Sequence, residues 1–304
     1  DTDFAGAVEM CNGMGACRKL EGTMCPSYMA TKDEEHSTRG RANLLRAAMS
    51  GRLPEGTMTS RRMFDALDLC LECKGCKLDC DSGVDMAKLK YEFLDHYFQV
   101  NGLPFRNKIF GHINRINRLG SRFAPFSNWA SNNPVGKFFA GAILGVHSDR
   151  SFPTFARETL PKWFAGRKIP LSSPLVNEET VTVTATDTVV LFNDTFMNYN
   201  YPQVGKAAVE LLEAAGLNVV LANGGCCGRP MISKGMLDEA SAHARETVDL
   251  LYPYAEQGIP IIGCEPSCLL TFRDEYPELV KNEKSAKVAE NSYMIDEFLT
   301  MLAE

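Results

Sequence analysis

The sequence predicts an α-helical domain followed by an α/β domain with a small parallel sheet. Two observations lead to this fold class. Clustered cysteines and helical periodicity mark the first hundred residues, whereas short apolar runs alternate with helical segments after residue 189. At 304 residues the chain is long enough for about two domains. We expect a helical domain over residues 1–100, an irregular helical or linker region over residues 101–188, and the α/β domain over residues 189–304.

Four closely spaced cysteines organise the N-terminal domain. Cys70, Cys73, Cys76 and Cys80 are separated by two, two and three residues, the spacing of an iron-sulfur ligand run in bacterial ferredoxins. Residues three apart on a tight helical turn face the same way, so the first three can hold three corners of a cubane. In two-cluster ferredoxins the fourth cysteine ligates the other cluster. The sequence therefore predicts a helical, ferredoxin-like domain with a second cysteine motif.

The second motif lies upstream in altered form. It contains Cys11, Cys17 and Cys25, and Met14 occupies the position where ferredoxin spacing places another cysteine. Three thiolates suit a 3Fe-4S centre, a 4Fe-4S centre with water or a side chain such as His36 as fourth ligand, or no stable cluster. In a cross-ligated assignment, each motif lends one cysteine to the other site. The first site then has Cys25, Cys70, Cys73 and Cys76, and the second has Cys11, Cys17 and Cys80.

Two other uses of the cysteines fit the sequence less well. Zinc also takes four cysteines, but it prefers two separated pairs to a close run of four. A disulfide framework is disfavoured because the total of eleven cysteines is odd, and because the adjacent Cys226 and Cys227 could hardly both be bridged without strain.

Helices are predicted on both sides of the cysteine run. Residues 38–49 have helical periodicity and end before Ser50 and Gly51, and residues 86–100 form a second amphipathic segment. Arg39, Arg41 and Arg46 on the first helix would offset the negative charge of thiolate-ligated clusters. A solvated basic face is the alternative.

Composition excludes several classes of protein. A net charge of −6 argues against nucleic acid as a partner. Thiolates that bind iron need a reducing compartment, so we expect a cytoplasmic location, with a peripheral position on the inner face of the membrane left open. The acidic N-terminus does not predict a signal peptide, and the longest apolar run, residues 138–146, is too short to span a bilayer.

The middle region is rich in proline and aromatic residues, which predicts short helices and turns between residues 101 and 179. Its apolar, basic-flanked segments could rest on a membrane surface or a partner domain, but we favour ordinary interdomain packing. Residues 180–188 have the pattern of an extended linker or edge strand.

The last third of the chain predicts strands over residues 189–192, 218–221 and 259–262, and ends with helices over residues 266–276 and 286–302. Ligand sites in parallel sheets lie beyond the carboxyl ends of the strands. Two cysteine pairs follow the second and third strands, and the flanking glycines leave room for a bulky inorganic group. We expect a further metal or thiol site formed by Cys226, Cys227, Cys264 and Cys268.

The motif from Gly225 to Gly228, followed by the pair Cys264 and Cys268, resembles the CCG domain of heterodisulfide reductase subunits and of glycolate and glycerol-3-phosphate dehydrogenase iron-sulfur subunits. The segments 9–17, 24–27, 36–44 and 70–76 resemble the C-terminal iron-sulfur half of FAD-linked D-2-hydroxyacid dehydrogenases, which include D-lactate and D-2-hydroxyglutarate dehydrogenases.

This resemblance implies a flavin domain ahead of the cysteines and usually a second CCG repeat behind the first. Neither segment is recognised between residues 1 and 304, so we expect FAD in a separate domain or subunit and an incomplete CCG domain. Asp81 stands where ferredoxin runs place proline, and Thr195 stands where some CCG domains have an additional cysteine, which departs from a full non-cubane cluster site.

The function implied is that of an iron-sulfur electron-transfer module. Electrons would pass from FAD through 4Fe-4S clusters to a quinone or other acceptor. We expect one 4Fe-4S cluster at the first site, a second 4Fe-4S or 3Fe-4S cluster, and a third cluster at the CCG site. A heterodisulfide-reductase-like subunit that acts on thiol or disulfide substrates is the alternative, and a zinc-stabilised interaction module is a third. No catalytic residues independent of the metal ligands are predicted.

Overall fold

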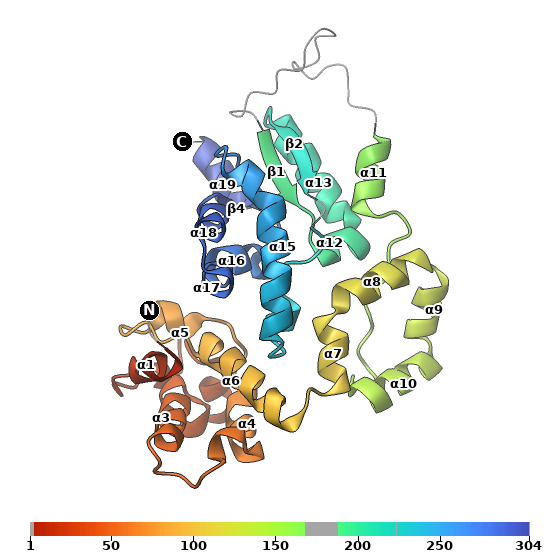
Figure 1. Ribbon diagram of the computed structural model, residues 1–304. Helices are drawn as coiled ribbons and strands as arrows, with labels where there is room; N and C mark the ends of the chain where they lie inside the picture. Colours follow the sequence, from red (N-terminus) through yellow and green to blue (C-terminus); the bar gives the residue numbers. More distant parts are fainter. Residues whose placement is uncertain (1–2, 168–187, 223, 304) are drawn as a thin grey trace. The chain divides into compact units, whose positions relative to one another are not determined.

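The computed structural model describes residues 3–167, 188–222 and 224–303, and it divides into two compact units (Figure 1). The N-terminal unit comprises residues 1–108 together with residues 231–237, and the C-terminal unit comprises residues 109–230 and 238–304. The linker was predicted over residues 180–188; residues 180–187 of it lie outside the described residues, as does the part of the proline-rich region after residue 167, whereas Thr188 begins a strand.

The N-terminal unit is helical. Its elements are α1 (Phe4–Glu9), η1 (Ala16–Arg18), α2 (Pro26–Thr31), η2 (Glu34–His36), α3 (Thr38–Met49), η3 (Thr57–Thr59), α4 (Arg61–Asp68), α5 (Gly75–Asp79) and α6 (Met86–Asn101). The two helices predicted beside the cysteine run are confirmed as α3 and α6. Each begins at a capping side chain, since Ser37 accepts from the backbone N–H of Gly40 and Asp85 accepts from that of Lys88.

The core of this unit joins apolar side chains to cysteines. Leu45 of α3, Leu67 of α4 and Phe93 of α6 are fully buried in one cluster, and Cys17, Cys25 and Cys76 belong to the same cluster. The thiols are therefore held at the inner side of the helices and not on a mobile surface loop.

The region that follows consists of short helices, as the prolines predicted for its described part. They are α7 (Phe105–Gly111), α8 (Ile113–Arg122), α9 (Phe126–Asn132), α10 (Pro134–Leu144) and α11 (Leu160–Gly166). Among the described helices, none is long and apolar enough to cross a bilayer.

The C-terminal unit is built on a four-stranded parallel sheet in the order β2-β1-β3-β4, which confirms the predicted fold class. The strands are β1 (Thr188–Phe192), β2 (Asn218–Ala222), β3 (Ile261–Gly263) and β4 (Ser292–Met294). The helices around it are α12 (Thr195–Tyr199), α13 (Pro202–Ala214), α14 (Arg229–Ile232), α15 (Leu237–Ala255), α16 (Pro266–Asp274), α17 (Tyr276–Val280), α18 (Glu283–Glu290) and α19 (Ile295–Ala303).

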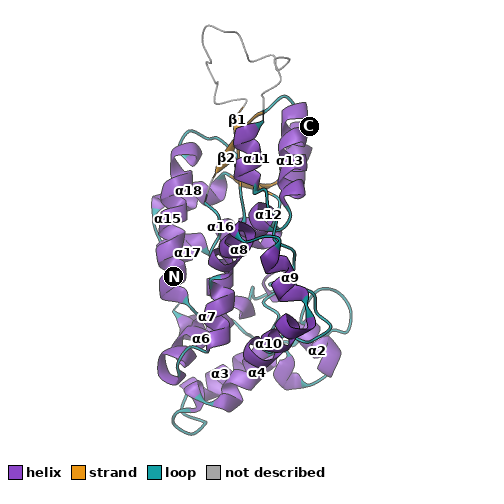
Figure 2. Ribbon diagram, turned by 90° about the vertical axis from the view of Figure 1, so that its right-hand side faces the viewer, coloured by secondary structure: helices purple, strands orange, loops and turns teal. Residues whose placement is uncertain are grey.

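Helices cover both faces of the sheet (Figure 2). Val190 and Phe192 pack toward α15 and α16, whereas Val189 and Leu191 point to the other face and pack toward α11 and α13. Because successive side chains of a strand alternate between faces, β1 is buried on both sides.

One predicted helix is wrong in its extent. Residues 286–302 were expected to form a single helix, but α18 ends at Glu290 and residues 292–294 form β4 before α19 begins. Ser292 is buried and its hydroxyl donates to the carbonyl of Val288, so the chain leaves the helix and pairs with β3. A three-residue strand is too short to show the alternation that marks strands in a sequence.

Candidate metal centres

Four cysteines from two separate segments line one cavity of the N-terminal unit. Three of them lie in or just before the short helix α5, and the fourth directly precedes α2. They are Cys25, Cys70, Cys73 and Cys76. These are the four cysteines that the cross-ligated arrangement assigns to the first site.

The backbone around this cavity adopts conformations that L-amino acids rarely take. Cys25, Glu72 and Lys74 have positive φ angles of 61°, 57° and 58°. A residue other than glycine in this region costs about 1–3 kcal/mol, and such strain persists only where the surrounding structure fixes it. Here the strained residues turn the chain so that sulfur atoms on both segments line the same space.

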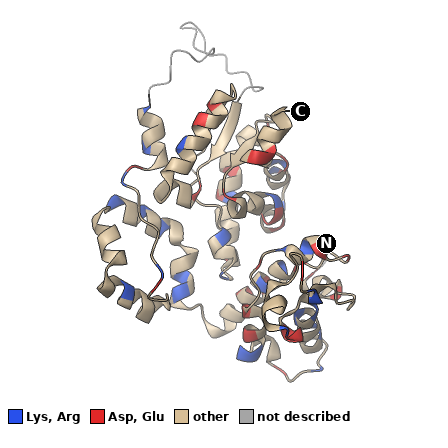
Figure 3. Cartoon of the chain, turned by 180° about the vertical axis from the view of Figure 1, so that it is seen from behind, with Lys and Arg blue, Asp and Glu red and all other residues tan. Residues whose placement is uncertain are grey.

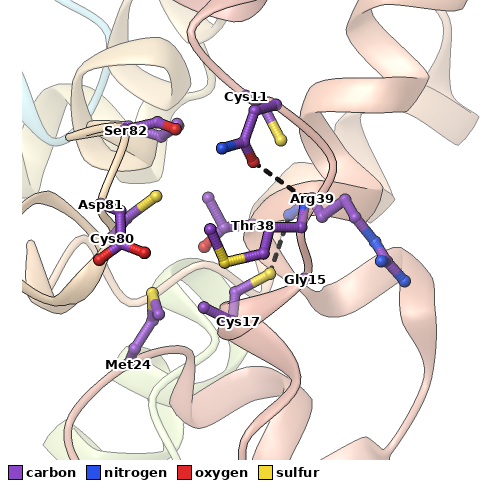
Figure 4. Close-up of a pocket in the computed structure, with 13 residues that line it drawn as sticks. Cys11, Gly15, Cys17, Met24, Thr38, Arg39, Cys80, Asp81 and Ser82 are labelled. Atoms are coloured by element: carbon purple, nitrogen blue, oxygen red, sulfur yellow. Dashed lines mark hydrogen bonds between the residues drawn. The ribbon is translucent and has the colours of Figure 1, made fainter.

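The remaining N-terminal cysteines line a second cavity (Figure 4). Cys11, Cys17 and Cys80 surround it, with Arg39 at one side. Met14, which replaces the cysteine expected from ferredoxin spacing, also lines this cavity and is 60% exposed. The second site thus has three thiols and an open position toward solvent.

Both cavities open to solvent. The space around the thiols, which includes part of that solvent, is about 360 Å³ at the second site and about 310 Å³ at the first. Within the described ranges, no three His, Cys, Asp or Glu side chains lie close enough together to hold a single metal ion. The donor set of soft thiols suits iron-sulfur clusters.

Backbone N–H groups point at two of the sulfur atoms. The amide of Met86 lies 3.4 Å from Cys76 Sγ, and the amide of Arg39 lies 3.3 Å from Cys17 Sγ. Hydrogen bonds to ligand sulfur stabilise the more negative, reduced state of a cluster and raise its potential. Each of the two sites has at least one such bond.

Two of the first-site thiols have raised pKa values. Burial raises the pKa of Cys76 to about 11 and also raises the pKa of Cys70. A metal ion binds the thiolate and displaces the proton, so loading of this site releases protons to solvent.

Buried cations accompany the first site. Arg41 is 1% exposed and donates to the carbonyl oxygens of Ala66 and His36. Lys90 is buried as well, and its Nζ donates to the carbonyl of Cys70 and lies 3.4 Å from the carboxylate of Glu72. Positive charge at this depth favours extra electrons on a cluster.

The arginines expected to offset cluster charge have specific partners. Arg39 binds Glu34 and the carbonyl of Gly13 at the second site, and Arg46 donates to the carbonyl of Cys11. Among these positions the solvated-face alternative fails most clearly for Arg41, which is buried.

His36 does not serve the second site. Its ring contacts the Thr31 hydroxyl at 2.9 Å, its carbonyl accepts from Ser27 on the first-site side, and it does not line the second cavity. The other side chains that line that cavity and carry a sulfur or oxygen donor are Asn12, Met14, Met24, Thr38, Asp81 and Ser82.

A third group of cysteines lies beyond the carboxyl ends of β2 and β3. Cys227 Sγ is 3.0 Å from Cys268 Sγ, so the two cysteine pairs converge as expected for a parallel sheet. Burial together with the carboxylate of Asp194 raises the pKa of Cys264 to about 11. Cys226 is buried directly beside these groups.

A histidine that was not predicted from the sequence lies beside this third group of cysteines. His243 of α15 has Nε2 3.0 Å from the carbonyl oxygen of Cys226. Hydrogen bonds from Cys227 and His243 lower the pKa of Cys226 to about 4. Gly228 leaves room for the ring, because a Cβ there would lie 3.3 Å from His243 Cδ2.

The end of β1 contributes two further polar residues. Thr195, at the position where some CCG domains have cysteine, donates a 2.6 Å hydrogen bond to the carbonyl of Gly225. Asn193 is fully buried, and among the described residues neither its amide nitrogen nor its oxygen has a hydrogen-bond partner. An unpaired buried amide is uncommon and suits a site completed by a ligand.

Comparison with protein families identifies both halves of this arrangement. The 4Fe-4S dicluster domain model matches residues 7–84, which contain all seven N-terminal cysteines, and the cysteine-rich domain model, CCG, matches residues 190–273, which contain the other four. A 4Fe-4S dicluster domain and a cysteine-rich CCG domain are therefore present in the chain. The resemblance predicted from its cysteine motifs is confirmed.

The curated relatives of this chain are oxidoreductases or their subunits. The chain is 26% identical to D-2-hydroxyglutarate dehydrogenase of Escherichia coli K12 over 92% of its own length and 31% of the relative's length. It is 29% identical to a subunit of the anaerobic glycerol-3-phosphate dehydrogenase of the same organism, over 58% of the chain and 42% of the relative. For the glycolate oxidase iron-sulfur subunit of that organism the identity is 25%, over 92% and 61%.

The chain therefore spans about a third of the length of the D-2-hydroxyglutarate dehydrogenases that it matches. No solved structure matches it.

Proposed function

We propose that this chain is the electron-transfer part of a flavin-linked D-2-hydroxyacid dehydrogenase. The observation that carries the proposal is the sorting of seven cysteines into two cavities, with Cys25 and Cys80 exchanged between their motifs. This exchange is the ligand pattern of two-cluster electron carriers. The relatives that match nearly the whole chain include a hydroxyacid dehydrogenase and an oxidase iron-sulfur subunit.

The chain's residues would hold clusters at neighbouring positions. Cys76 belongs to the first site and Cys80 to the second, and they stand at the two ends of the five-residue helix α5. Bound clusters would supply one-electron redox chemistry between FAD, in a separate domain or subunit, and a quinone or other acceptor. Arg41, Lys90 and the backbone amide of Met86 would stabilise added negative charge at the first site.

The assignment of metal ligands forms part of this proposal. Cys25, Cys70, Cys73 and Cys76 hold a 4Fe-4S cluster at the first site, and three cysteines hold a 4Fe-4S or 3Fe-4S cluster at the second. Cys226, Cys227, Cys264 and Cys268 hold a third cluster at the CCG site. Because these thiols must stay reduced, we place the protein in the cytoplasm.

The experiment compares Cys73→Ser with Leu78→Ser in the full-length enzyme, purified without oxygen. Cys73 lines the first cavity, whereas Leu78 lies on α5 with its side chain 87% exposed. We expect the iron content of Cys73→Ser to fall by about the amount in one cluster. Reduction of the acceptor should be blocked, while substrate still reduces the flavin. Leu78→Ser should behave as wild type. Normal reduction of the acceptor by Cys73→Ser would contradict the assignment of Cys73 as a cluster ligand.

A second candidate function is favoured by the CCG site itself. The 3.0 Å approach of Cys227 and Cys268 and the unpaired amide of Asn193 suit a site that handles thiol or disulfide substrates, as in heterodisulfide reductase subunits. Addition of a thiol or disulfide to the oxidised protein would then change the electron paramagnetic resonance signal of the CCG site. In a simple electron carrier, only the redox potential would change that signal.

A further inference from the structure

Three consecutive helices of the C-terminal unit expose apolar side chains and bury none of them. α8 buries only Asn117 and Ser121, and both are hydrogen-bonded, to Asn200 and to the carbonyl of Ala156. α9 and α10 bury no residue at all. This order is the reverse of a helix that packs an apolar stripe on a protein core.

Polar contacts also hold α9 in place. Asn128 accepts from the backbone N–H of Phe155 and donates to the carbonyl of the same residue, and Asn132 accepts from the N–H of Phe152. These amides fix the inner side of the helix against residues 152–155. The aromatic side chains are left on the outside.

The exposed apolar side chains of this region form what we call the aromatic surface. Each member is more than half exposed, and Phe126 and Trp129 stack with ring centroids 5.6 Å apart. Single exposed apolar residues are ordinary, but eight within 25 residues mark an interaction site. The members are Leu119, Phe123, Phe126, Trp129, Val135, Phe138, Phe139 and Ile143.

The charges around the aromatic surface have one sign. Residues 109–148 contain four Lys or Arg and no Asp or Glu, in a chain whose net charge is −6. Figure 3 shows Lys and Arg, but no acidic residue, on α8–α10. Arg115, Arg118 and Arg122 are exposed and recur at helical spacing along α8.

We propose that α8–α10 dock the protein on the surface of a membrane that contains anionic lipids. Long basic side chains reach the headgroups while neighbouring phenylalanine and tryptophan rings enter the boundary with the acyl chains. α10 has 11 residues, about 16 Å of helix, roughly half the thickness of the hydrocarbon core, so it lies along the surface. The charged side chains of this region are all basic, although the chain as a whole is acidic. Charge of one sign suits anionic lipid headgroups better than a protein partner, whose interface usually carries charges of both signs.

This inference goes beyond the proposed electron transfer and does not depend on it. A membrane surface is, however, where a quinone acceptor would be met, so the two are compatible. The sequence had favoured interdomain packing for this region. The different proposal is made because α8–α10 expose their apolar side chains and bury none of them.

The test is sedimentation of the full protein, with its clusters loaded, with two kinds of vesicle. One kind is phosphatidylcholine alone, and the other contains an equal amount of phosphatidylglycerol. We expect binding to the anionic vesicles, weakening as salt is raised, and little binding to the neutral ones. Each arginine near an anionic surface contributes about fivefold in partition, so Arg115→Gln, Arg118→Gln and Arg122→Gln together should weaken binding about 100-fold.

A second variant tests the aromatic rings. Phe126→Ser with Trp129→Ser should abolish binding, and Val204→Ser with Leu211→Ser, two similarly apolar and exposed residues of α13, should leave it unchanged. The thermal unfolding temperature should be the same in all three variants. Failure to bind either vesicle, or equal loss in the α13 variant, overturns the proposal. Loss of thermal stability in the aromatic variant alone would show that another part of the protein covers this surface, which also overturns it.

Discussion

The ammonium group of Lys90 donates a 2.7 Å hydrogen bond to the carbonyl oxygen of Cys70, the first cysteine of the ferredoxin-like run. The same nitrogen binds the carbonyl of Asp68 at 3.0 Å and faces the carboxylate of Glu72. This one buried ammonium group therefore contacts Asp68, just before the run, Cys70, its first cysteine, and Glu72, between its first two cysteines. Lys90 sets both the shape and the charge of the first site.

Lys90→Met should therefore destabilise the protein and lower the first-site potential. Removal of one partner from a buried ion pair costs about 3–5 kcal/mol, because the carboxylate of Glu72 loses the cation 3.4 Å away. Chemical denaturation under anaerobic conditions measures the first effect, and a redox titration followed by electron paramagnetic resonance measures the second. The double variant with Glu72→Leu should recover much of the stability and much of the potential, because it removes one charge of each sign. Lys284→Met, on an exposed ion pair, should change neither.

Met14→Cys should complete the second site. Met14 lines the cavity that Cys11, Cys17 and Cys80 share, at the position where ferredoxin spacing has a cysteine. A fourth thiolate favours a 4Fe-4S cluster over a 3Fe-4S centre, so iron should rise by about one atom per chain and any signal of the oxidised state should disappear. The control is Met10→Cys, since Met10 is also exposed but does not line the cavity. Unchanged iron and spectra in Met14→Cys would show that the vacancy is not at this position.

Lys234→Met should stabilise the protein at neutral pH. Burial, with the nearby Lys90 and Arg106, lowers the pKa of Lys234 below its usual value of 10.5. A lysine with a lowered folded pKa binds its proton less tightly in the folded state, so wild-type stability rises as pH increases from the folded pKa toward 10.5. The advantage of Lys234→Met should thus be largest at pH 7 and shrink with increasing pH. Lys287→Met, an exposed position, should give a difference that does not depend on pH in this way.

Asn193→Leu separates folding from ligand binding at the CCG site. Because the buried amide has no hydrogen-bond partner among the described residues, its loss should leave the cluster-free protein equally stable or more stable by about 1 kcal/mol. Asn117→Leu, which removes a buried amide that does donate a hydrogen bond, should cost about 1–3 kcal/mol. If Asn193 faces a bound group, iron content at the CCG site or thiol-induced spectral change should fall in Asn193→Leu alone. A large loss of stability in the cluster-free Asn193→Leu would contradict this interpretation.

The spacing of cysteines was sufficient to predict the two N-terminal cavities. Ligands of a cluster must sit at fixed separations along a tight turn, so the positions of Cys70, Cys73 and Cys76 carry the geometry in the sequence itself. The convergence of Cys227 and Cys268 was predictable for a similar reason, since both follow the carboxyl ends of parallel strands.

The residues that surround the cysteines were less predictable, because they arrive through tertiary packing. His243 is on α15 and Asn193 follows β1 directly, and neither belongs to a spaced motif. Lys90 gave one usable signal: it lies four residues after Met86 and four before Leu94, on the stripe of α6 that is otherwise apolar and buried. A charged residue on such a stripe indicates a buried partner.

The N-terminal unit includes residues 231–237, which follow the Cys226 and Cys227 motif in the chain. Gly235 of this segment has a positive φ, and a Cβ there would lie 2.7 Å from the backbone of Leu94 on α6. The chain leaves the ribosome N-terminus first. The seven cysteines of the dicluster domain therefore emerge long before residues 231–237, the last segment of their own unit. Assembly of this unit must wait until more than three quarters of these 304 residues have been synthesised. If these thiols hold the clusters proposed above, insertion of the clusters into the complete unit can follow only after that point of translation.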